Sequence, residues 1–174
     1  ELGSLPGSTS SSGAIIPFQE RSRMSGAMIS TSFPFRGLAQ ILGLTWMDGV
    51  TQLTESGCQR LSRTTVKLLA KHDFVYLPLC VDRVEPVERQ CAMERIDQHL
   101  LKPLTEHLAQ LGEFRCLVAV DDRPSSTIPF VALGTGLPSH PAVRLTSEAV
   151  ANTPLTFPDG TAAFTWLTGN PGVR

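Results

Sequence analysis

The chain has 174 residues, of which 41% are hydrophobic and 18% are charged, and its formal net charge is −1. This length supports one domain that buries roughly 70% of the surface of its unfolded form, and the hydrophobic fraction excludes wholesale disorder. The near-neutral charge provides no basic field for nucleic acid or an anionic membrane, so we expect neither as a partner. Because no apolar run reaches about 18 residues and the first residues do not form a secretory signal, we expect a cytoplasmic protein.

The first residues differ in composition from the rest of the chain. Residues 1–13 contain five serines and three glycines, which is typical of a flexible tail or linker. We therefore expect residues 1–15 to be such a tail and residues 16–174 to form a single domain. The charged fraction is below the roughly 25% of average soluble domains, which indicates apolar surface that something else covers.

Apolar runs alternate with amphipathic ones in the first half of the chain. Apolar periodicity and turn residues predict a strand, a helix, a second strand and a second helix. These elements are expected at Gly26–Thr31, at Arg36–Leu42 with Gly43 as its end, at Thr45–Leu53, and from Ser56 or Gly57 onward.

The second half continues the alternation. Asp73–Val81 is a continuous apolar run, typical of a strand that is covered on both faces. A helical pattern follows from Glu85 to Leu111, and Pro103 must kink or split it because proline has no N–H to donate. Buried strands are expected at Phe114–Val120 and Ile128–Leu133. Strands separated by helices predict a three-layer α/β/α domain with a mainly parallel sheet.

Acidic residues follow two of the predicted strands. Asp82 comes after one strand, and Asp121 and Asp122 come after the next. Since ligands of parallel sheets bind beyond the carboxyl ends of the strands, these carboxylates are candidate ligands for a divalent metal. The alternative is that they begin turns and cap helices, as strand-end aspartates often do.

Histidine and cysteine give weaker signals. None of the four histidines directly follows a strand, so we do not expect a metal site rich in histidine. The four cysteines form no Cys-x-x-Cys pair, which argues against a zinc or redox motif. Cys80 and Cys116 lie inside apolar runs and are expected to be buried free thiols.

Several runs together resemble the archaeal-type cofactor-independent phosphoglycerate mutases of the alkaline phosphatase superfamily. The runs that carry the resemblance, in chain order, are IPFQER (16–21), SGAMIST (25–31), FRGLAQILGL (35–44), HDFVYLPLCVD (72–82), MERIDQHLLKPL (93–104), CLVAVDD (116–122) and IPFVALG (128–134). Their order and spacing match the family over about residues 16–150. The resemblance implies an alkaline-phosphatase-like sheet, of which this chain would hold only part.

The resemblance also implies chemistry: in this family Asp and His residues hold two divalent metals, and a Ser or Thr near the N-terminus accepts the phosphoryl group. Asp82 matches the acid of the family's Asp-x-x-Gly-His motif, but the chain continues as DRVEPVER and the Gly-His is missing. Asp121 matches the acid of an Asp-His pair whose histidine is missing, with Asp122 or a gap in its place. Arg123 stands where the family has another histidine ligand. Arg36 agrees with the family's basic residue on the first helix.

These departures lead to three hypotheses. First, the chain is a portion of a phosphoglycerate-mutase-like protein that is catalytically silent as it stands, holds no cofactor, and has an N-terminal segment or domain as the partner that completes its sheet. Second, it forms an active isomerase or metal-dependent phosphatase once that segment is present, with manganese or zinc held by Asp82, Asp121 and Asp122. Third, it binds phosphate or another anion without catalysis, through Arg36 and Arg123 with Arg83 nearby.

Overall fold

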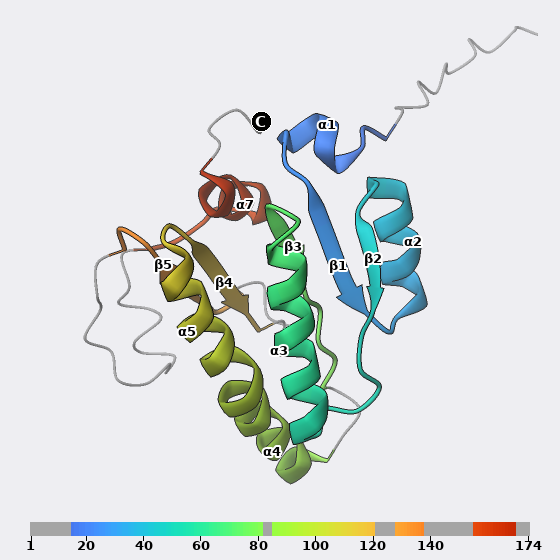
Figure 1. Cartoon of the computed structure of the whole chain (residues 1–174), viewed down its shortest axis with the longest axis vertical. Coiled ribbons are helices and arrows are strands. Elements are labelled where there is room, and N and C mark those ends of the chain that lie inside the picture. The colour runs from blue at the N-terminus through green and yellow to red at the C-terminus, as the bar shows by residue number, and fades with distance from the viewer. Residues whose placement is uncertain (1–14, 82–84, 121–127, 138–154, 170–174) are drawn as a thin grey trace, which may run out of the picture.

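The computed structural model describes residues 15–81, 85–120, 128–137 and 155–169. A parallel sheet lies between two helical layers (Figure 1). The helices α3, α4 and α5 lie on one face, and α1 and α2 on the other. The expected α/β class with a parallel sheet between helices is confirmed. The expected tail falls almost entirely outside the described residues.

Strand β1 (Gly26–Ser30) is the centre of the sheet. It pairs in parallel with β2 (Thr45–Asp48) on one side and β3 (Phe74–Tyr76) on the other, and all five of its residues are buried. Successive side chains point to opposite faces of a strand. Ala27 and Ile29 accordingly join the apolar cluster of α3 and α4, whereas Met28 joins the cluster of α2.

Helix α2 (Phe33–Leu42) ends where the sequence predicts. Gly43 adopts a left-handed conformation with φ of 68°, and its N–H donates to carbonyls of the last turn. A glycine takes this conformation at no steric cost, so it stops the helix cleanly. The short helix α1 (Phe18–Ser22), which the sequence reading does not predict, precedes β1 and packs Phe18 on the cluster of α2.

Helix α3 (Glu55–Leu69) begins one or two residues before the predicted start. Thr54 caps it, because its hydroxyl accepts a hydrogen bond from the Gly57 N–H at 3.2 Å. The buried face contains Cys58, Leu61, Thr65 and Leu68, a helical spacing that lays one stripe against β1.

The predicted break at Pro103 takes the form of a π-helical turn. Helix α4 (Pro86–Ile96) passes into η1 (Asp97–Leu101) and then α5 (Lys102–Leu111). Within η1 the Lys102 N–H donates to the carbonyl of Asp97, five residues earlier. Because Pro103 offers no N–H to the preceding turn, the wider turn lets the helix continue without a sharp kink.

The last two strands form a separate sheet. Strand β4 (Arg115–Ala119) pairs with β5 (Phe130–Gly134) in antiparallel register, with Leu117 opposite Ala132. Helix α7 (Gly160–Thr168) packs against β4. The prediction of a mainly parallel sheet therefore holds for β1 to β3. The sequence pattern did not reveal that β5 runs antiparallel to β4.

Two predicted strands are shorter and less buried than expected. Of Asp73–Val81 only Phe74–Tyr76 is a strand, and Tyr76 is 42% exposed. Of Thr45–Leu53 only Thr45–Asp48 is a strand, since the chain turns at Gly49. The predicted burial of the strand around 114–120 is also wrong, because no residue of β4 is fully buried. In each case fewer neighbouring strands and helices cover the run than its apolar sequence suggests.

Candidate functional site at the carboxyl edge of the sheet

The strands β1 and β2 end at the same edge as the beginnings of α3 and α4, toward the bottom of Figure 1. Ser30, the buried last residue of β1, organises this edge. Its carbonyl accepts from the Gly49 N–H at 3.2 Å, and its hydroxyl accepts from the Ser32 N–H at 3.1 Å. These bonds hold the loops after β1 and β2 side by side at the edge where parallel sheets bind ligands.

Of the site residues expected from sequence, the structure places Arg36. It lies in the first turns of α2, close to the carboxyl end of β1, and is exposed with no ion pair to any described residue. Asp82, Asp121, Asp122, Arg83 and Arg123 lie outside the described residues. Val81 and Val120 are the last described residues before the acids, so the convergence of the acids stays a prediction.

A hollow of about 320 Å³ opens at the N-terminus of α3. Its lining is mostly polar and consists of Val50, Thr51, Gln52, Thr54, Ser56, Gly57 and Arg60. A Cβ at Gly57 would lie 2.5 Å from the carbonyl oxygen of Gln52, so the loop can approach the helix only over a glycine. The sequence reading missed this hollow, although the Thr-x-x-Gly spacing of the cap was a usable signal.

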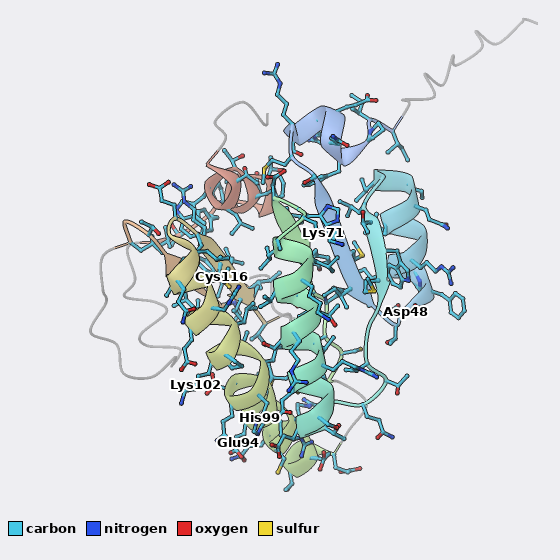
Figure 2. All side chains as sticks on the ribbon, in the orientation of Figure 1. Asp48, Lys71, Glu94, His99, Lys102 and Cys116 are labelled. Atoms are coloured by element: carbon cyan, nitrogen blue, oxygen red, sulfur yellow. The ribbon has the colours of Figure 1, made fainter. Side chains whose placement is uncertain are left out.

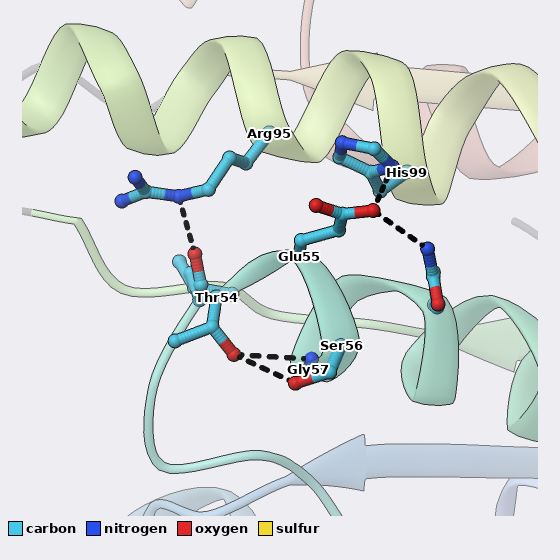
Figure 3. Close-up of polar contacts among 8 residues, drawn as sticks. Thr54, Glu55, Ser56, Gly57, Arg95 and His99 are labelled. Atoms are coloured by element: carbon cyan, nitrogen blue, oxygen red, sulfur yellow. Dashed lines mark hydrogen bonds and ion pairs between the residues drawn. The ribbon is translucent and has the colours of Figure 1, made fainter.

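A polar network fastens this loop to α4 (Figure 3). The Arg95 Nε donates to the carbonyl of Leu53 at 2.8 Å, and its guanidinium also pairs with Glu88. One turn further, His99 Nδ1 lies 3.8 Å from Glu55 Oε1. Because the side chains in these contacts are partly or largely exposed, each contact adds little to stability, and their main effect is to position the loop.

At the opposite edge, Asp73 and Ser25 tie the beginnings of β3 and β1 together. The Asp73 carboxylate accepts hydrogen bonds from the N–H and the hydroxyl of Ser25, both at 2.8 Å. These bonds stabilise the charged form and lower the pKa of Asp73 below its ordinary value. The pair is structural, since it lies away from the edge at which ligands are expected.

The described residues do not by themselves fit a metal ion. No group of three or more His, Cys, Asp or Glu side chains gathers in the ranges that the structure covers. Figure 2 shows that such side chains lie far apart: Asp48 is the last residue of β2, Cys116 lies on β4, and His99 lies at the other end of α3 from Lys71.

The cysteines differ from expectation. Cys80 is exposed and Cys116 is half-buried, so the prediction that both are buried is wrong; the fully buried thiol is Cys58. Burial raises the pKa values of Cys58 and Cys116. None of the four cysteines forms a disulfide bond with another described residue. The helices in the described part of the chain include none with the length and hydrophobicity of a membrane span.

Comparison with known proteins finds similar proteins both by sequence and by structure. The chain is 27% identical over 135 residues to the 2,3-bisphosphoglycerate-independent phosphoglycerate mutase of Methanosphaerula palustris, a match that covers 72% of this chain and 33% of the relative. The structure is similar to the cofactor-independent phosphoglycerate mutase of Thermoplasma acidophilum, with a TM-score of 0.62 and 26% identity over 81% of this chain and 35% of the other. No family model matches the chain.

These matches confirm the resemblance seen in the sequence. The chain is phosphoglycerate-mutase-like in both sequence and fold over most of its length. It spans about a third of the length of each relative.

Proposed function

We propose that this chain provides one part of a phosphoglycerate-mutase-like α/β domain and that it is catalytically silent by itself. What carries the proposal is the loss of the family's ligand histidines in the runs that carry the resemblance: the Gly-His after Asp82 is missing, Asp122 or a gap takes the place of the next histidine, and Arg123 stands where the family has another. A guanidinium keeps its charge at every physiological pH, so Arg123 would repel a cation where the family holds one. The retained β1, by contrast, belongs to the scaffold.

The completing partner is a further segment of a longer polypeptide. The relatives have about two thirds of their length outside the matched region, which is enough chain to supply additional strands. The low charged fraction and the exposed apolar side chains of the described residues are consistent with a surface that this segment covers.

Interconversion of 3- and 2-phosphoglycerate tests the proposal directly. Purified residues 1–174 with added manganese or zinc should give no turnover above the buffer, while the Methanosphaerula palustris enzyme serves as the positive control. Turnover that disappears in Asp121→Ala but survives in Asp97→Ala would overturn the proposal in favour of an active metalloenzyme. Asp97 is the matched control because it is an exposed aspartate on η1.

Anion binding without catalysis is the second candidate, favoured by the exposed Arg36 near the carboxyl end of β1. Phosphate binds arginine through two parallel hydrogen bonds, and such binding stabilises the folded state. Under this candidate, phosphate raises the Tm of the wild type and has a smaller effect on Arg36→Gln and Arg123→Ala. An equal phosphate effect in all three proteins would exclude it.

A further inference from the structure

Helix α2 has an exposed apolar stripe on the side opposite its buried Ala39. Phe33 is 83% exposed, Ile41 is 53% exposed and Leu38 is 41% exposed. Phe33, Gly37 and Ile41 are four residues apart, so they lie one above another on successive turns, and Leu38 lies beside them. We call Phe33, Gly37, Leu38 and Ile41 the α2 stripe. The stripe faces away from the sheet, at the outer side of the molecule (Figure 1).

The exposed side of α3, on the other face of the sheet, is different. It contains four exposed charged residues, Glu55, Arg60, Arg63 and Lys67. Helix α2 has a single charged residue, Arg36. Charged side chains normally cover the solvent side of a surface helix. Helix α3 therefore has the composition of a helix that faces water, whereas α2 has that of a helix whose outer side is covered.

Gly37 lies in the middle of the stripe, although the described structure does not require a glycine there. Its backbone is that of an ordinary helix, and a Cβ at this position would meet nothing within 4 Å. Because glycine is less favourable than alanine inside a helix, a helix that faced only water would be more stable with alanine. The missing side chain is useful where a second backbone approaches closely. Gly37 therefore indicates an approach to α2 from outside the described chain.

The stripe is symmetric about this glycine. Phe33 lies four residues before Gly37, and Ile41 lies four residues after it. If a second α2 crosses the first in the antiparallel direction with Gly37 on a two-fold axis, the two glycines face each other. Phe33 of each helix then contacts Ile41 of the other, as an isologous interface requires. Rows of residues four apart pack in this way at a crossing angle of about 50°, the commonest class in globular proteins. The stripe therefore complements itself.

The size of the stripe indicates how strong such an association would be. Its three exposed side chains present roughly 300–400 Å² of mostly apolar surface, the size of patch that is often functional on a monomer. Since interfaces are about 60% apolar, a polar rim would bring the buried area to roughly 500–700 Å² for each copy. A standard interface buries about 800 Å² for each partner. The area therefore predicts a weak, reversible dimer.

A strand that completes the sheet would leave the stripe exposed. Such a strand pairs at an edge and lies in the plane of the sheet, whereas the stripe faces away from that plane (Figure 1). The stripe itself contains no charged residue, so its occupant must supply apolar side chains in the matching arrangement. A second copy of the chain supplies the same residues in that arrangement.

We propose that two copies of this chain associate through their α2 stripes into a two-fold symmetric dimer. Gly37 lies at the crossing point, and Phe33 and Ile41 form one apolar contact on each side of the axis. The proposal does not depend on the proposed function, because a silent chain and an active one would present the same stripe.

Sedimentation velocity of residues 1–174 tests the dimer over a protein concentration range of about 1–300 µM. We expect a reversible equilibrium between monomer and dimer with a Kd of about 10–100 µM. Phe33→Glu and Ile41→Glu should each raise the Kd at least about tenfold, because either change places an unpaired carboxylate in the apolar contact. Val87→Glu is the matched control: Val87 is 76% exposed on α4, outside the stripe, and its Kd should change less than about twofold.

Gly37→Leu distinguishes the interface from an effect on folding. Leucine favours a helix more than glycine does, so at concentrations too low for dimers this variant should unfold at a higher urea concentration than the wild type. At the crossing point, however, the leucine side chain would hold the two backbones apart, and the Kd should rise at least about tenfold. A more stable monomer together with a weaker dimer is the result that only a contact at Gly37 explains.

Three results would overturn the proposal: a wild type that stays monomeric at about 300 µM, a dimer that Phe33→Glu leaves unchanged, or a dimer that Gly37→Leu leaves unchanged. If the gene encodes further residues, the complete polypeptide should form the same dimer and lose it in Phe33→Glu. A complete polypeptide that is monomeric over the same concentrations would assign the stripe to another segment of that polypeptide and would also overturn the proposal.

Discussion

Strands β1 and β4 each have five residues and an apolar sequence, but their surroundings differ. All five residues of β1 are buried between two partner strands and two helical layers. Strand β4 has one partner and no fully buried residue. The difference shows that an apolar run becomes a core strand only when other strands pair with both of its edges and helices cover both of its faces. Among the described residues, β1 meets these conditions and β4 does not.

The largest expected difference between the two regions comes from deleting matched leucines. Leu100 is fully buried in the cluster of β1 and α3, whereas Leu117 of β4 is half-buried. We expect Leu100→Ala to lower the free energy of unfolding by about 2–5 kcal/mol and Leu117→Ala by about 1 kcal/mol. Urea unfolding measures both values. Equal losses would mean that the two regions are equally well packed.

Adding one methyl group tests how tightly β1 is packed. A Cβ at Gly26 would lie 2.5 Å from Leu44 Cδ2 and 2.9 Å from a ring carbon of Phe18. Gly26→Ala should therefore cost about 1–3 kcal/mol of unfolding free energy, as overpacking does. Gly37→Ala is the control, since its Cβ would meet nothing within 4 Å and alanine favours helix α2 by about 0.5–1 kcal/mol. If Gly26→Ala left the free energy of unfolding unchanged, the side chains of Leu44 and Phe18 would be able to move apart at little cost.

Two helix caps provide a smaller comparison. Thr54 caps α3, which packs on β1, and Asp159 caps α7, which has no buried residue and packs on β4. Thr54→Ala should cost about 1 kcal/mol in global unfolding. Asp159→Ala should cost less than half of that and instead speed amide exchange within α7. If Asp159→Ala lowered the free energy of global unfolding as much as Thr54→Ala or more, α7 would unfold together with the main core.

The smallest effect is a dependence of stability on pH at the Ser25–Asp73 pair. Because the pKa of Asp73 is lower in the folded chain than the value near 3.9 of an unfolded one, the unfolded chain binds more protons as the pH falls below about 5. Stability should therefore decrease toward acid, and the advantage of the wild type over Asp73→Asn, less than about 1 kcal/mol at pH 7, should disappear as the pH falls through the lowered pKa of Asp73 in the folded chain.

Denaturant unfolding at a series of pH values measures this effect. In Ser25→Ala the backbone N–H still donates to Asp73, so an intermediate pH dependence is expected. An identical pH dependence in the wild type and Asp73→Asn would assign the acid sensitivity to other carboxylates.

Local chemistry made much of the fold predictable from sequence. Gly43 ends α2 and Pro103 disrupts a long helix because each has a backbone property that no other residue shares. The length of β3 was overestimated because a strand needs a second strand to pair with along its whole length. Strand β1 pairs with β3 only at Phe74–Tyr76. The antiparallel direction of β5 follows from chain connectivity rather than from its own residues.

The candidate site was less predictable than the fold. Arg36 was singled out because the resemblance matches it to the family's basic residue on the first helix, and the structure places it on α2. The Arg95–Leu53 contact was missed because it joins segments about 40 residues apart and ends on a backbone carbonyl, which leaves no pattern in the sequence. The hollow at Gly57 was missed although Thr54 and Gly57 have the spacing of the helix cap. The acids at Asp82, Asp121 and Asp122 stay predictions.

We propose that the chain keeps a phosphoglycerate-mutase-like scaffold without the metal chemistry, and a metal-binding experiment can decide this. Purified residues 1–174 would be titrated calorimetrically with manganese and with zinc after elemental analysis of the protein as isolated. We predict no stoichiometric metal and no binding above the buffer control. Tight binding of one or more equivalents that is lost in Asp121→Ala would contradict this account and would mean that the strand-end acids still form a working site.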